Sequence, residues 1–278
     1  MRQIFVVLVT VSLVVACSAS GKRSGFAKPM AKVDVMREIA MTGNLKPVDF
    51  SGKNLSDLDL ANTNFRGANL KGTYFRYSDL KESNFQNADL SGANLRQTRL
   101  VGSLMAGANL RGANLQSADL RGAVLDGVDL SNADLTGARL DRASMRNINL
   151  AGATLTDASL VKAYLGDSNL SGVDLRKVNL KGADLFGTIL RGSNFEGTNL
   201  KSVDLSHTDL SGSNLQRADL SYANLQHALL FGANFYQAKM DKSDLRGANI
   251  FRTSFVNASL RKAQFRGANL SESNFTSA

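Results

Sequence analysis

From Phe50 to Phe275, every fifth residue of the chain is Leu, Phe, Met or Ile. On an α-helix a step of five residues turns the side chain by about 500°, so these positions would spiral around the surface. On one continuous strand they would alternate between the two faces. The pattern therefore predicts many short units, each an extended piece followed by a turn, which all point the same position inward.

The other positions of the unit follow rules that fit this prediction. Two residues before each large apolar residue the chain has a small or β-branched residue, except at Lys53 and Leu58, and two such positions share one face of a strand. Glycine is concentrated two places after it, with Gly166 as the exception, where a type II turn needs a positive φ. The residue just before it is usually Asn or Asp and is expected to point outward.

The repeated motif A(D/N)LxG, as in ANLRGANLQSADLRGAVLDG from Ala108 to Gly127, resembles the pentapeptide-repeat proteins. The resemblance implies an all-β fold, a right-handed quadrilateral parallel β-helix, over 44–278. It also implies four repeats per coil, so that residue n lies against residue n+20. Such a solenoid would have about 11 to 12 coils and a length of roughly 55 Å, because neighbouring strands lie about 4.8 Å apart.

The N-terminal sequence MRQIFVVLVTVSLVVACSAS has the features of an export signal. Its uncharged apolar run is too short for a membrane-spanning helix, which needs about 20 residues, and is typical of a secretory signal peptide over 1–16. Val14-Val15-Ala16-Cys17 resembles the lipobox of bacterial lipoproteins, which implies lipidation of Cys17. The alternative is an ordinary signal peptide with a chance cysteine. Residues 17–31 are then a lipidated N-terminus and flexible tether.

Both ends of the solenoid need protection, because an open coil exposes unpaired strand edges. Residues 32–43 have the pattern of a short amphipathic helix that stops at Gly43, and we expect it to cap the first coil. At the other end an inward Phe recurs at Phe235, Phe255, Phe265 and Phe275. The sequence shows no helix after the last repeat, so a homodimer through this C-terminal coil is a further expectation.

The net charge of +9 raises the question of a nucleic-acid partner, but its distribution argues against one. The segment 18–47 carries six bases and two acids, so the excess is concentrated near the N-terminus. In one column of residues spaced by twenty, the charge alternates in sign: Asp79, Arg99, Asp119 and Arg139. Short basic runs, such as Lys181 over Lys201, are interrupted and have no interleaved aromatic residues. We therefore predict no nucleic-acid binding.

Catalytic chemistry has no candidate in this sequence, and a metal site has only a weak one. His207 and His227 are spaced to stack at one corner of adjacent coils, with Asp209 or Asp167 as a further ligand. Their column continues as Gly187 and Gly247, so a third ligand is missing from it. The alternative is a pair of polar corner residues. We predict no enzyme activity and no cofactor, because an interior filled by Leu and Ala leaves no room for a substrate.

Surface recognition is the remaining possibility, and two groups of outward apolar residues are candidates for it. In one outward column, Asn or Asp is replaced by Leu104, Val124, Ser144 and Tyr164, with Phe186 further along the same face. The second group lies nearer the end, with Phe231 next to Phe251, Leu229 beside them and Tyr236 on the next face.

Together these features predict a non-enzymatic, lipid-anchored rod in the bacterial cell envelope that binds an unknown protein partner or a second copy. Ser18 after Cys17 favours the outer membrane, on its periplasmic side, because an Asp there retains some lipoproteins in the inner membrane. The alternative comes from the family resemblance, since some pentapeptide-repeat proteins mimic DNA and protect topoisomerases from quinolones. That activity needs an acidic cytoplasmic surface, whereas this chain is basic and has an export signal.

Overall fold

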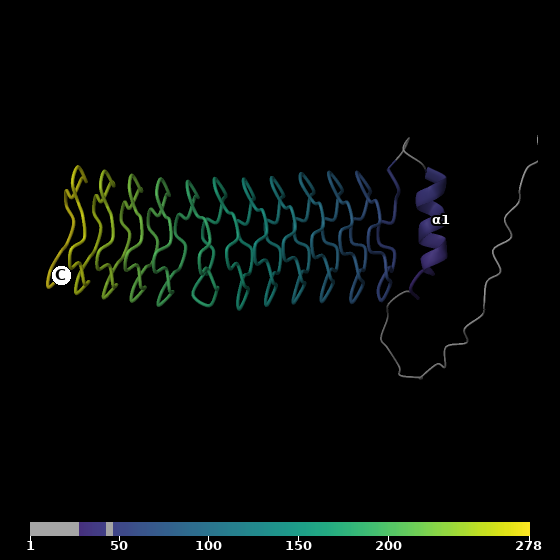
Figure 1. Cartoon of the computed structure of the whole chain (residues 1–278), viewed down its shortest axis with the longest axis horizontal. Coiled ribbons are helices and arrows are strands. Elements are labelled where there is room, and N and C mark those ends of the chain that lie inside the picture. Colours follow the sequence, from purple (N-terminus) through teal and green to yellow (C-terminus); the bar gives the residue numbers. More distant parts are fainter. Residues whose placement is uncertain (1–27, 43–46) are drawn as a thin grey trace, which may run out of the picture.

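The computed structural model describes residues 28–42 and 47–278. Within these residues the chain forms one α-helix, α1 (Lys32–Thr42), followed by a long solenoid (Figure 1). The predicted signal peptide 1–16, Cys17, most of the tether and Gly43 lie outside the described residues. None of the described helices is long and apolar enough to cross a bilayer.

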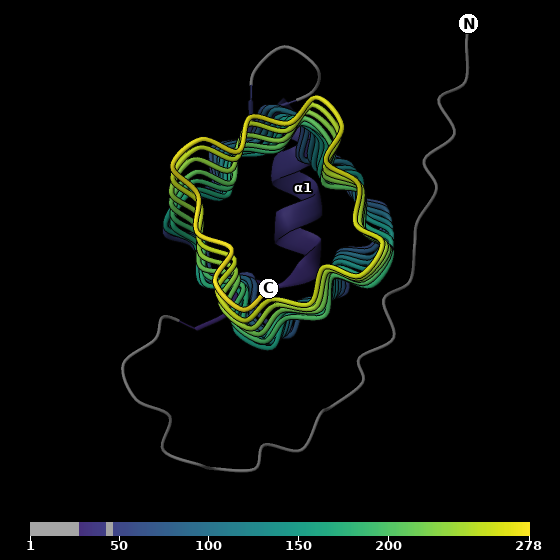
Figure 2. The ribbon, with the colours of Figure 1, turned by 90° about the vertical axis from the view of Figure 1, so that its left-hand side faces the viewer.

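Parallel β-bridges between residue n and residue n+20 hold the coils together. They run from Asp49 with Asn69 to Ser254 with Asn274, and each extended piece is so short that it contributes a single bridging residue. Seen along its axis, the backbone of the solenoid has four sides (Figure 2). Buried side chains fill the space that these sides enclose. The predicted stacking of four five-residue units per coil is therefore confirmed.

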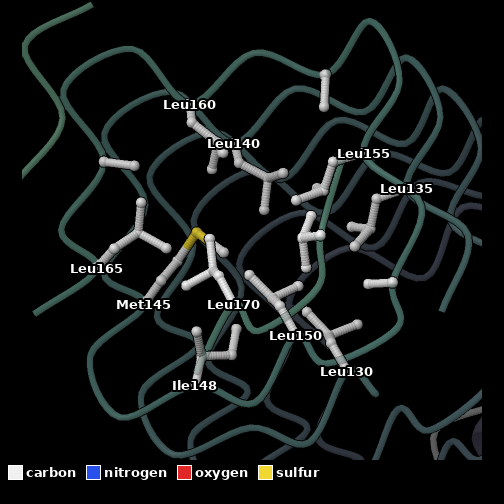
Figure 3. Packing of buried hydrophobic residues seen from close by; sticks show 14 of the residues in the cluster. Leu130, Leu135, Leu140, Met145, Ile148, Leu150, Leu155, Leu160, Leu165 and Leu170 are labelled. Atoms are coloured by element: carbon white, nitrogen blue, oxygen red, sulfur yellow. The ribbon is translucent and has the colours of Figure 1, made fainter. Parts of the chain in front are cut away.

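Leucine, phenylalanine and alanine side chains fill the centre as stacked layers. The large inward side chains are almost all inaccessible to solvent, and Figure 3 shows those of Leu130, Leu150 and Leu170 one above the other. Burial of each leucine side chain contributes about 1.5–3 kcal/mol. Some small inward positions hold a hydroxyl, as at Ser78, whose Oγ donates to the carbonyl of Leu55 at 2.7 Å. The solenoid thus needs no cofactor to fill its interior.

Each corner from Gly52 to Ser277 is a turn whose third residue has a positive φ, except the corner at Lys177. The carbonyl of Leu110 accepts a hydrogen bond from Ala113 N at 3.0 Å, with φ +64° at Gly112 between them. At Gly107 and Gly187 an added Cβ would lie 2.5 Å from a side-chain oxygen of the coil before, Asn87 Oδ1 and Asp167 Oδ1. Gly166, the exception in the sequence, has no positive φ.

The side chains of the outward Asn and Asp residues accept a hydrogen bond from a backbone N–H that has no partner in the bridges between coils. The side-chain Oδ1 of Asn109 accepts from Arg111 N at 3.1 Å, and Asp129 does the same for Ser131 N at 2.9 Å. This Asx turn satisfies the backbone N–H just after the inward leucine. The motif therefore specifies the backbone at three of its five positions: the inward leucine, the Asn or Asp, and the corner glycine.

The helix α1 lies across the first coil (Figures 1 and 2). Val35 is fully buried against the core, and Met30 and Ile39 pack partly against it. Just before the helix, Met30 N donates to the carbonyl of Asn54 at 2.8 Å, and Lys32 Nζ lies 3.2 Å from Asp59 Oδ2. These contacts cover apolar side chains and one backbone acceptor at this end of the solenoid.

In the coil that ends at Ala278, stacked phenylalanine rings extend the core. The rings of Phe255 and Phe275 lie 4.8 Å apart, and the ring of Phe265 packs edge-on against Phe275 at 6.1 Å. Phe265 and Phe275 are partly buried, whereas Leu270 is exposed. Pairing of two copies through this coil stays a prediction.

The ladder between coils is interrupted at two places on neighbouring sides. No bridge joins Thr154 to Asp174, and none joins Asn179 to Asn199, within the described solenoid. A surface hollow of about 360 Å³ opens beside the first gap and is lined by Thr156, Asp174, Arg176 and Lys177. Valines occupy two successive small inward positions there, Val173 and Val178. Two of the lining residues, Arg176 and Asp174, form an ion pair at 2.7 Å.

We predict that the inward leucines, and not the outward polar residues, dominate the stability. Leu115→Ala should lower the free energy of unfolding by about 2–5 kcal/mol, because it leaves a cavity in a closely packed layer. Asn114→Ala, its neighbour on the outside, should lower it by about 0.5–1.5 kcal/mol through the lost Asx hydrogen bond. Chemical denaturation measures both values, and equal losses would contradict this account of the core.

The aspartates make stability depend on pH. In Asp244 the hydrogen bond from Arg246 outweighs the effect of burial and holds the pKa below its ordinary value. A carboxyl whose pKa is lower in the folded state stabilises the fold above its unfolded pKa of about 3.9, and this contribution is lost as the pH falls through the folded pKa.

The melting temperature of the wild type should therefore fall between about pH 5 and pH 2. Asp244→Asn should show a smaller fall, because Asn keeps the Asx hydrogen bond but does not titrate. Thermal unfolding followed by circular dichroism compares the two, and identical pH profiles would show that Asp244 does not contribute.

Candidate interaction surface

Three aromatic rings stack along one corner of the C-terminal half of the solenoid. The ring centroids of Phe186 and His207 lie 5.2 Å apart, and those of His207 and His227 lie 5.1 Å apart. His207 and His227 occupy corner positions with φ near +58°, which places them on successive coils. Gly247 follows on the next coil, where an added Cβ would lie 2.6 Å from His227 Nδ1. The glycine thus leaves room for the histidine ring.

The side next to this corner carries two exposed aliphatic residues in the outward column. Ile189, Asp209 and Leu229 are joined by successive bridges. Ile189 is 41% exposed and Leu229 is 43% exposed. Both replace the usual Asn or Asp, so neither can accept the Asx hydrogen bond, which contributes about 0.5–1.5 kcal/mol. At these two positions the chain gives up a stabilising bond and gains an exposed apolar side chain.

Asp209, between these two residues, is held by an ion pair. Its side-chain Oδ2 lies 2.5 Å from Arg191 Nε, and Ser211 N donates to Oδ1 at 3.0 Å. Burial alone would raise the pKa of Asp209, but the hydrogen bonds from Ser211 and Arg191 outweigh it and lower the pKa. A charged, fixed pair therefore lies within the apolar side.

Two phenylalanine rings continue the surface to the next corner. Phe231 is 46% exposed, and its ring stacks on that of Phe251 at 5.7 Å. The guanidinium of Arg252 covers the Phe251 ring at 4.9 Å, which leaves Phe251 only partly exposed. We name the whole region the aromatic surface: Phe186, Ile189, His207, His227, Leu229, Phe231 and Phe251.

The structure places the other sequence candidates elsewhere. Leu104, Val124 and Tyr164 lie in one column through Ser144, as expected, but Val124 is half-buried and Arg146 lies over the Tyr164 ring at 6.0 Å. Tyr236 is half-buried at a corner one side beyond Phe231. Neither Tyr236 nor the Leu104 column belongs to the aromatic surface. Phe186 lies at the corner next to that column, two residues after Asp184, and its ring stacks on His207.

The two histidines form a stack and not a chelating pair in this arrangement. Their ring planes are 25° apart and face each other, so the in-plane nitrogen lone pairs do not converge on one point. Among the described residues, no group of three or more His, Cys, Asp or Glu side chains is placed to hold a metal ion. The stacking gives the pair a packing role with Phe186.

Ile189 is the residue of this surface that sequence reasoning missed. The signal was present, because Ile189 breaks the Asn or Asp rule just as Val124 does. It stands alone in its stretch of sequence, whereas its neighbours Phe186 and Leu229 lie next to it only once the coils are stacked. The predicted alternation of charge along the column of Asp79, Arg99, Asp119 and Arg139 is confirmed. Arg99 pairs with Asp79 at 3.2 Å, and Arg139 lies 3.8 Å from Asp119.

Several solved structures are similar to this chain. HetL, a pentapeptide repeat protein involved in heterocyst differentiation regulation from the cyanobacterium Nostoc sp. strain PCC 7120, is 25% identical, with a TM-score of 0.37, over 87% of this chain and 95% of HetL. QnrB1, a plasmid-mediated fluoroquinolone resistance protein, is 21% identical, with a TM-score of 0.31, over 78% of this chain and 90% of that one. No match to a curated protein sequence is found.

The family model "Pentapeptide repeats" matches the sequence in eight copies between residues 54 and 276. The matched segments follow one another along almost the whole solenoid, and they carry the inward leucines, outward Asx residues and corner glycines described above. The chain therefore belongs to the pentapeptide-repeat family.

Proposed function

We propose that this protein is a non-enzymatic, lipid-anchored rod of the bacterial cell envelope that binds another protein through its aromatic surface. In this proposal the rod is a right-handed quadrilateral β-helix of about 11 to 12 coils. The observation that carries the proposal is the exposure of Phe186, Ile189, Leu229 and Phe231 within three successive coils, which the ring stack of Phe186, His207 and His227 connects.

Three properties of the aromatic surface support a protein partner. Its stacked rings are large and rigid, and such rings provide much contact area with little loss of side-chain freedom. The Arg191–Asp209 pair supplies a fixed polar group inside the apolar area, which can orient a partner. Replacement of two Asx residues by Ile189 and Leu229 also costs stability, so the repeat alone gives no reason for them.

The DNA-mimicking alternative remains the less suitable one. A DNA mimic presents a surface dense in carboxylates, whereas many aspartates here are engaged in Asx turns and ion pairs with arginine, as Asp119 is with Arg121 at 2.6 Å. The net charge of +9 has the wrong sign for such a role.

Substitution within the aromatic surface should abolish partner binding without unfolding the rod. Leu229→Asp/Phe231→Asp should reduce crosslinking to the partner in the cell envelope at least tenfold, because it places two charges in the centre of an apolar contact. Both side chains are exposed, so the melting temperature should change little.

The matched control is Leu104→Asp/Tyr164→Asp, which adds the same charge to exposed residues of a different column. It should retain the crosslinked partner. The proposed site is wrong if the Leu229/Phe231 variant crosslinks as well as wild type, or if both variants lose the partner equally.

Membrane attachment depends on Cys17 in this proposal. Cys17→Ser removes the thiol that would carry the acyl chains, so the mature protein should move from the membrane fraction to the soluble fraction. Fractionation of cells followed by immunoblotting measures the distribution. Retention of the variant in membranes at the wild-type level would contradict the lipid anchor.

A further inference from the structure

One corner of the solenoid carries an exposed base on six of the seven coils between Arg142 and Lys262. Stacked in order along the axis, these side chains are Arg142, Lys162, Lys181, Lys201, Lys242, Arg261 and Lys262, which we name the basic edge. They are the first or second residues after the inward apolar residue of the same side, which is Leu or, at Met240, Met, so they repeat every twenty residues. The edge is roughly 29 Å long, because six steps of about 4.8 Å separate its ends.

Within the part of the chain that the structure describes, no acid forms an ion pair with the bases of this edge. None of the seven forms an ion pair with the described residues, whereas Arg121, on the coil before Arg142, is paired with Asp119. Two aspartates, Asp141 and Asp241, lie at the same corner, but each accepts hydrogen bonds from a serine hydroxyl and a backbone N–H of the next coil. The corner therefore holds seven bases and only two acids, both already hydrogen-bonded, and its net charge is strongly positive.

The one coil of this stretch without a base has Tyr222 at the corner. Lys242 Nζ lies 4.9 Å from the Tyr222 ring centroid and donates to its hydroxyl at 3.0 Å, and Lys201 Nζ lies 5.7 Å from the same ring. The hydrogen bond and the charge of Lys242, with that of Lys201, lower the pKa of Tyr222. The expectation that basic runs lack an interleaved aromatic residue is thus wrong at this corner.

We propose that the basic edge binds the anionic phospholipid surface of a membrane and lays the rod flat on it. The inference rests on the membrane attachment proposed above. The basic edge lies on a convex corner and runs from coil to coil, so several of its bases can reach one plane at once. Five of its seven bases are lysines, hydrated point charges that suit a surface of mobile headgroups better than fixed bidentate recognition. Bases close to such a surface are attracted by its negative charge, and Tyr222 is amphipathic enough for the interface.

A rod that lies on the membrane by its basic edge keeps the aromatic surface accessible. Tyr222 and Phe231 are nine residues apart and lie at corners separated by two of the four sides. The basic edge and the Phe231 corner are therefore diagonally opposite each other. A rod bound by its basic edge presents Phe231 and Phe251 away from the membrane, where a protein partner can reach them.

The test measures binding of the full-length chain to lipid vesicles, with Cys17→Ser throughout so that acylation does not mask the effect. Vesicles of phosphatidylcholine with 30% phosphatidylglycerol are compared with pure phosphatidylcholine by flotation at low and high salt. The quadruple variant Lys162→Gln/Lys181→Gln/Lys201→Gln/Lys242→Gln should lose more than about tenfold in the preference for anionic vesicles. Salt should weaken the preference of the unmodified edge.

The control variant Arg66→Gln/Arg96→Gln/Arg111→Gln/Arg266→Gln removes the same charge from exposed, unpaired bases at other corners. It should keep most of the preference. Equal losses in both variants would show only a net-charge effect and overturn the proposal, as would no loss in either. Stronger edge-dependent binding to a 20-nucleotide single strand than to the vesicles would assign the edge to nucleic acid instead. Because acylation is absent, these results do not depend on whether Cys17 carries lipid.

Discussion

The register that places residue n against residue n+20 is the constraint on which the rest of the molecule depends. Each coil must return to its starting point after twenty residues, or the backbone N–H groups miss their carbonyl partners on the next coil. Buried leucines set the inward direction, positive-φ corners turn the chain, and Asx side chains accept the remaining N–H. All three devices recur with the same period, so each coil reinforces the next.

This register also converts small departures from the repeat into surface features. Residues twenty apart become neighbours, so His207 and His227 stack, and Ile189 joins Leu229 through one intervening residue. The same relation aligns lysines into a ridge at one corner. The apolar and basic features lie on different sides, so the two proposed contacts, with a protein and with a membrane, do not compete for the same residues.

Much of the fold could be predicted from the sequence because its information is local and repeated. The strict five-residue period gave the inward column, and the glycine positions gave the corners. Ser144 shows what could not be predicted: it lacks the Asx acceptor, and Asp126 from the coil before accepts from Arg146 N in its place. The interrupted bridges near Asp174, the Phe186–His207 contact and the position of Tyr222 between two lysines all depend on side-chain shape across coils. The period carries no information on shape.

A distance along the rod tests the register most directly. Ser91 and Ser211 belong to one column, six coils apart, and each can be replaced by cysteine with little change in shape. Spin labels on Ser91→Cys/Ser211→Cys, in a Cys17→Ser background, should give a narrow distance distribution centred near roughly 29 Å by pulsed electron paramagnetic resonance. A broad distribution, or a centre shifted by more than about two coil spacings, would contradict the stacking of residue n on residue n+20.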